Sequence, residues 1–176
     1  KATPVKQFAI EAGEPVQFAF SPEPYYEVVQ GADLFSTPID EPSLYGAFKP
    51  IFEDRDCDVL AFDTKRLRHL LEKFSISINA TVFDAMIADY LLDATRPATS
   101  FAMLCERVCP NQKPNCAMLF SLKESMLREL DEANMTKLYT DMELPLASVL
   151  FEMEHTGFRV DRDILKQLQT QINEQS

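Results

Sequence analysis

The first third of the chain alternates short apolar runs with turn residues, a pattern that predicts short strands. The runs are QFAI (7–10), VQFAF (16–20) and YYEVV (25–29), and the turn residues between and after them are Gly13, Pro15, Pro22, Pro24 and Gly31. β-Branched and aromatic residues favour strands, whereas glycine and proline favour turns. Because the three runs follow one another closely, we expect an antiparallel meander.

The middle of the chain changes to a strand followed by helices. DVLAF (58–62) has the length and composition of a strand that is covered on both faces. The next eleven-residue segment places Leu67, Leu70, Leu71 and Phe74 on one helical face. The same reasoning predicts a strand at ISINA (76–80) and helices at 43–54, 64–74, 81–94 and 100–108. Pro50 should shorten or kink the helix at 43–54.

The last third is predicted to be helical throughout. Helical spacing of apolar residues marks the segments 116–139, 141–156 and 161–175. Gly157 is a stop signal for the second of these helices, and Asp161 can cap the third. Strands first, then a strand–helix unit, then helices predict a three-layer α/β domain with a C-terminal helical extension.

Composition and charge narrow the function classes. The chain has 176 residues and a net charge of −11, from 17 basic and 28 acidic residues. Such an acidic domain is poorly suited to hold DNA by itself, because nucleic-acid affinity depends on Lys and Arg. The apolar runs are too short to span a membrane, and no secretion signal is visible at the N-terminus. Because the chain starts at Lys1, we expect an excised piece of a longer protein.

The four cysteines, Cys57, Cys105, Cys109 and Cys116, are expected to be reduced and mostly buried. Cys105 and Cys109 could share a helix face, but no second pair completes a tetrahedral zinc site. His69 lies on a charged helix beside leucines, which indicates a surface imidazole.

The remaining candidates for chemistry are carboxylates at strand ends. Glu11 follows QFAI, and Asp63 follows VLAF. Two-metal phosphodiester hydrolysis needs several carboxylates around two divalent ions, and two acids are too few. Asp63 also directly precedes a helical pattern, so it is a candidate metal ligand and equally a candidate N-cap. The sequence contains neither of the glycine-rich motifs that cradle nucleotide phosphates.

Two ordered blocks of the sequence resemble bacterial DNA polymerase I, the family A DNA polymerases. ELPLASVLFEMEHTGFRVDRDILKQL (143–168) resembles the start of the polymerase region, and FDTKRLRHLLEKFSISINATVFDAMIADYLLDA (62–94) resembles the second half of the 3′–5′ exonuclease domain. The resemblance implies a ribonuclease H-like 3′–5′ exonuclease fold, a mixed sheet flanked by helices, over residues 1–136. It also implies that residues 137–176 are the first helices of the polymerase (thumb) region.

The family's metal-binding motifs are incomplete in this chain. The family's first motif, Asp-x-Glu, corresponds to Ala9 and Glu11, and the aspartate of the second motif corresponds to Asp63. The tyrosine and aspartate of the third motif fall near Cys116, where neither exists. The resemblance therefore implies a vestigial exonuclease site, with Glu11 and Asp63 as remnants and Ala9 and Cys116 as lost positions. Asp63 then serves as a helix cap.

The resemblance also implies a role and partners. We expect a piece of a polymerase of DNA replication and repair that supports the polymerase domain of the same chain and reaches DNA only through that parent protein. Mg²⁺ is expected for the parent polymerase, and no cofactor or membrane contact for this segment. The truncated tail could self-associate, and the location would be the bacterial cytoplasm. The alternatives are an active, metal-dependent proofreading exonuclease with displaced motifs, or an unrelated adaptor domain.

Overall fold

The structure, a computed structural model, describes residues 7–13, 15–28 and 39–175, and its centre is a five-stranded mixed sheet. The strands are β1 (Gln7–Glu11), β2 (Val16–Ala19), β3 (Tyr25–Val28), β4 (Asp58–Ala61) and β5 (Thr81–Asp84). Their order in the sheet is β3-β2-β1-β4-β5. β1, β2 and β3 form the predicted antiparallel meander, and β4 and β5 run parallel to β1.

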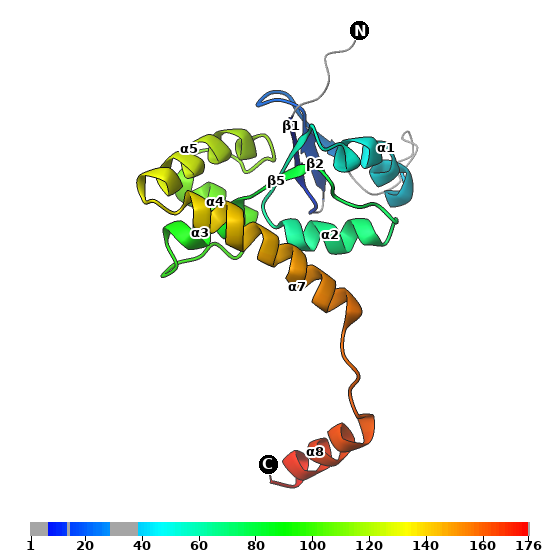
Figure 1. The fold of residues 1–176 in the computed structure, drawn as a ribbon. Helices are drawn as coiled ribbons and strands as arrows, with labels where there is room; N and C mark the ends of the chain where they lie inside the picture. Colours follow the sequence, from blue (N-terminus) through cyan, green and yellow to red (C-terminus); the bar gives the residue numbers. More distant parts are fainter. Residues whose placement is uncertain (1–6, 14, 29–38, 176) are drawn as a thin grey trace.

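Helices cover both faces of the sheet, as the predicted ribonuclease H-like fold requires (Figure 1). The helices are α1 (Glu41–Glu53), α2 (Thr64–Glu72), α3 (Ala85–Leu92), α4 (Phe101–Val108) and α5 (Met118–Glu132). α1 and α2 pack on one face with Phe8 and Ile10 of β1. α3, α4 and α5 pack on the other face with Ala9. Because side chains alternate along a strand, β1 contributes to both cores.

One predicted strand and the start of one predicted helix are wrong. Residues 76–80 form no strand, because the N–H groups of Asn79 and Ala80 donate to the carbonyl oxygen of Phe52 at the end of α1, at 2.9 and 3.1 Å. The strand is the next segment, β5, although its sequence pattern predicts the start of a helix. Parallel pairing with β4 takes these residues into the sheet, and the helix α3 begins only after Asp84. α1 continues past Pro50 to Glu53.

The predicted helix at 116–139 is interrupted. α5 ends at Glu132, and Asn134 adopts a left-handed backbone conformation with φ 58° that ends the helix. The chain then continues as one helical rod made of α6 (Thr136–Leu138), the π-helical turn η1 (Tyr139–Glu143) and α7 (Leu144–Thr156). The predicted domain boundary between residues 136 and 137 falls inside α6.

The C-terminal helix α8 (Arg162–Gln175) follows an extended link and stands apart from the sheet and its helices (Figure 1). Its apolar residues Ile164, Leu165, Leu168 and Ile172 are between 47% and 65% exposed. Among the residues that the structure describes, no helix is long and apolar enough to cross a membrane.

Candidate functional site

Three carboxylates lie at one edge of the sheet, where the parallel strands β1, β4 and β5 end. Glu11 is the last residue of β1, Asp84 is the last residue of β5, and Asp63 follows β4 by two residues. Parallel strands end at the same edge of a sheet, so the topology gathers these side chains. The structure thus brings the two predicted remnants, Glu11 and Asp63, close enough for their charges to interact.

Glu11 is a partly buried acid with an altered protonation equilibrium. Burial raises its pKa to about 7, the nearby Asp63 charge acts in the same direction, and Arg66 opposes both. The carboxyl group is therefore only partly ionised at neutral pH. A group in this state is a weaker ligand for a divalent ion than an ordinary glutamate, because the metal binds the carboxylate form.

Asp63 caps helix α2. Its Oδ1 accepts a hydrogen bond from the Arg66 N–H at 2.9 Å, and its carbonyl oxygen accepts from the Leu67 N–H at 3.1 Å. The backbone of Asp63 is extended, as N-cap residues usually are. The sequence left Asp63 open as a metal ligand or an N-cap, and the geometry shows the N-cap.

Ala9 lies in the apolar core rather than at an open surface. Its side chain is fully buried in a cluster with Leu60 of β4 and Leu119 and Leu122 of α5. Ala9 and Glu11 lie two residues apart and therefore point to the same face of the sheet. A methyl group thus stands where the resemblance implies a carboxylate, in the same apolar cluster as residues of α5.

Cys116 is also a core residue. Its side chain is fully buried, and burial, assisted by the charge of Glu11, raises the pKa of its thiol to about 12. Burial likewise raises the pKa of Cys105 to about 12. Because only thiolates bind metals well, these groups are poor ligands at neutral pH. Cys109 is partly exposed and the other three cysteines are buried, which confirms that most of them are buried.

Asp84 is a further residue of this site, and it was not predicted from the sequence. Its Oδ2 accepts from both the N–H and the hydroxyl of Thr64, at 2.7 and 2.6 Å, and its Oδ1 accepts from the Ile87 N–H at 2.9 Å. Burial raises its pKa to about 6, and these hydrogen bonds act in the opposite direction. Asp84 therefore joins the first turns of α2 and α3. Its position between an apolar run and a helical pattern was the available signal.

The hydroxyl of Tyr139 completes this buried network. It accepts from the Asp84 N–H at 2.9 Å and lies 3.1 Å from the Asp84 carbonyl oxygen, to which it can donate. The ring is 2% exposed and lies 6.2 Å, centre to centre, from the ring of Phe83. Tyr139 thus ties the helical rod to the edge of the sheet.

The residues at this edge do not fit a pair of catalytic metal ions. Two divalent ions need several ionised carboxylates with free oxygen atoms. Asp63 and Asp84 cap helices, Glu11 is partly protonated, and apolar packing occupies the positions of Ala9 and Cys116. Within the described ranges, no three His, Cys, Asp or Glu side chains are placed to hold a metal.

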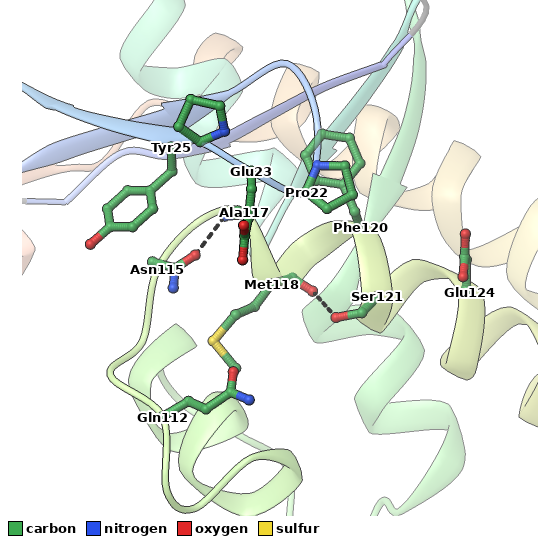
Figure 2. A pocket seen from close by; sticks show the side chains of 11 residues that line it. Pro22, Glu23, Tyr25, Gln112, Asn115, Ala117, Met118, Phe120, Ser121 and Glu124 are labelled. Carbon is green, nitrogen blue, oxygen red and sulfur yellow. Dashed lines mark hydrogen bonds between the residues drawn. The ribbon is translucent and has the colours of Figure 1, made fainter.

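One open cavity lies away from these acids. Figure 2 shows a cavity of about 780 Å³ between the turn before β3 and the start of α5, with Glu23, Tyr25, Asn115, Met118 and Glu124 in its wall. None of the three acids at the sheet edge lines it.

His69 lies on the surface of α2, as predicted for a surface imidazole. Its side chain is 36% exposed, and its Nε2 lies 2.8 Å from the carboxylate of Glu154.

Comparisons with known proteins identify the relatives of this chain. Residues 26–112 match the sequence model of the family described as DNA polymerase I, ribonuclease H-like domain. DNA polymerase I of Caldicellulosiruptor bescii is 34% identical over 122 residues, which cover 64% of this chain and 14% of that protein. The Geobacillus stearothermophilus enzyme is 29% identical over 140 residues (65% and 16%), and the Bacillus subtilis enzyme 24% over 169 residues (81% and 19%).

A solved structure shares the fold. It is the POL domain of Pol1 from M. smegmatis in complex with DNA primer-template and dNTP, with a TM-score of 0.67 and 23% identity. The match covers 96% of this chain and 32% of that one. The chain thus spans less than a fifth of the length of the three relatives named above.

Proposed function

Since this chain belongs to the DNA polymerase I family through its ribonuclease H-like domain, we propose that it is a segment of a bacterial DNA polymerase I in which the exonuclease-like domain has lost catalysis and acts as a structural support. The domain would hold the first helices of the polymerase region in place. Polymerisation, with its Mg²⁺ requirement, and contact with primer–template DNA would belong to the rest of the parent protein. The proposed location is the bacterial cytoplasm.

The observation that carries this proposal is the packing at Ala9 and Cys116. Both residues are fully buried beside α5, so the space that ligands and nucleophilic water would need is filled by protein. The two remaining acids, Glu11 and Asp63, cannot balance the charge of two divalent ions. The support role rests on a separate feature. Tyr139, which belongs to the helical rod, is buried and hydrogen-bonded to the backbone of Asp84 at the end of β5.

A nuclease assay tests the loss of catalysis. The purified chain is incubated with a labelled single-stranded 3′ overhang and Mg²⁺ or Mn²⁺, and shortening of the strand is followed on a gel. We expect shortening at the same rate with the Glu11→Gln variant, with the metal chelated, and with no protein. Metal-dependent shortening that Glu11→Gln abolishes would instead support the alternative of an active exonuclease.

The reading frame downstream of residue 176 tests the parent protein. We expect it to continue into a polymerase palm with its metal-binding carboxylates. A frame that continues into an unrelated domain would contradict the support role and favour the adaptor alternative.

A further inference from the structure

Helix α7 lies beside α2 (Figure 1). Charged and imidazole side chains pair between the two helices at the molecular surface. The carboxylate of Glu154 lies 2.8 Å from Lys65 Nζ and 2.8 Å from His69 Nε2, and these contacts hold the pKa of Glu154 below its usual range. His155 Nδ1 contacts Glu72 Oε1 across the same two helices. We call these five residues the clasp. Their side chains are between 33% and 53% exposed, so salt screens their attraction.

The apolar part of this contact is small. The ring of Phe151 meets the imidazole of His69 edge-on, 4.8 Å between centres, and stacks on His155 of its own helix at 6.2 Å. No described residue of α7 is buried, and Val149 and Met153 are 53% and 63% exposed. The distal half of α7 therefore depends on the clasp for its position.

The other end of the rod is held differently. Tyr139 is buried in the core cluster, and its hydroxyl is hydrogen-bonded to both the N–H and the carbonyl oxygen of Asp84. Breaking this contact would leave buried polar groups without partners, which is costly. The rod thus has a firmly held start and a weakly held end.

An irregular turn lies between these two ends. Pro145 has no N–H to donate to the carbonyl oxygen of Asp141, and its ring would clash there. The Leu144 N–H donates instead to the carbonyl oxygen of Tyr139, five residues earlier, which makes the wider π-helical turn η1. Bends and kinks in helices concentrate at such turns and at proline.

We propose that α7 is a hinged arm, with η1 as its pivot and the clasp as a contact that opens and closes. The arm swings as a rigid helix, because its own backbone hydrogen bonds do not change. This inference goes beyond the support role, since it makes the link between the α/β domain and the following helices adjustable. It does not depend on that role.

Nuclear Overhauser contacts in the 176-residue chain test the hinge. The chosen variant is Glu154→Gln, which removes the charge that Lys65 and His69 share. We expect the Phe151–His69 contact, which spans two helices, to weaken about twofold or more. The Phe151–His155 contact lies within α7 and should keep its intensity, and so should the Tyr139–Phe83 contact beyond the pivot. Raising salt to about 1 M, where the Debye length is about 3 Å, should act on the unmodified chain in the same way.

Glu106→Gln is the matched control. It removes the same charge from an exposed position on α4, for which the described residues show no ion pair, so all three contacts should stay unchanged. An undiminished Phe151–His69 contact in both Glu154→Gln and high salt would overturn the clasp. A simultaneous loss of the Tyr139–Phe83 contact would overturn the pivot, because the rod would then have detached as a whole.

Discussion

Among single residues, Ala9 decides whether this edge of the sheet can bind metal, because an apolar core residue stands where a metal ligand would be needed. In Ala9→Asp, a carboxylate would enter the apolar cluster formed with Leu60 and Leu119. We expect no nuclease activity and a loss of at least ~3 kcal/mol in the free energy of unfolding, because a buried unpaired charge is strongly destabilising. Urea unfolding measures the loss. Ala102→Asp, the same change at an exposed position of α4, should alter stability by about 0.5 kcal/mol or less.

Glu11 gives a prediction about pH. Its pKa rises from 4.5 in the unfolded chain to about 7 in the folded one, so between these values the folded state binds more protons. The free energy of unfolding should therefore fall as pH rises from about 4.5 through 7, by on the order of 3 kcal/mol at most. Glu11→Gln should remove this part of the slope and stabilise the chain at pH 8 but not at pH 4.5. Urea unfolding at several pH values measures the slope. Because the pKa of Asp84 is raised to about 6, the free energy of unfolding of Glu11→Gln should still fall with pH, but less steeply. An identical slope in both proteins would contradict the assignment to Glu11.

At the scale of elements, the sequence was sufficient where local pattern and tertiary structure agree. The meander of β1, β2 and β3, the unit of β4 and α2, and the cap at Asp63 were all predictable, because turn residues and a capping acid mark their ends. The segment 76–84 was misplaced because ISINA and TVFD are equally apolar. Only contact with Phe52 on one side and pairing with β4 on the other distinguishes them.

The candidate site was predictable only in part, for a similar reason. Glu11 and Asp63 follow apolar runs and are visible in the sequence. The network of Asp84, Thr64 and Tyr139 joins residues up to 75 positions apart, and no local pattern reports such distances. The break after α5 depends on one left-handed residue, Asn134, which the helical pattern hides.

Tyr139 tests how firmly the helical rod is joined to the sheet. In Tyr139→Phe the ring still fills the core, but the buried Asp84 N–H loses its acceptor. We expect a loss of about 1–3 kcal/mol in the free energy of unfolding. Tyr90→Phe, on a ring that is 51% exposed, is the control and should have little effect. Equal stability of Tyr139→Phe and the unmodified chain would show that the hydroxyl does not hold the rod.

In the whole molecule, the burial of apolar side chains declines from the sheet toward the C-terminus. The α/β domain buries two apolar clusters, α7 buries no described side chain, and α8 leaves its apolar stripe in solvent. Contiguous exposed apolar surface of this kind promotes association. The net charge of −11 opposes association through long-range repulsion, and salt weakens that repulsion.

Deleting residues 157–176 should therefore separate folding from association. We expect the shortened chain to unfold at nearly the same urea concentration as the full chain, because none of the removed residues that the structure describes packs in a buried cluster. Val59→Asp, which buries a charge in the interior strand β4, should instead unfold the domain. Brief protease treatment of the full chain should cut first near Gly157, at the start of the extended link.

Sedimentation at high salt should show association of the full chain but not of the shortened one. If the deletion lowered the unfolding midpoint as much as a core mutation, α8 would have to be an integral part of the domain, and its exposed stripe would then contact the domain in solution.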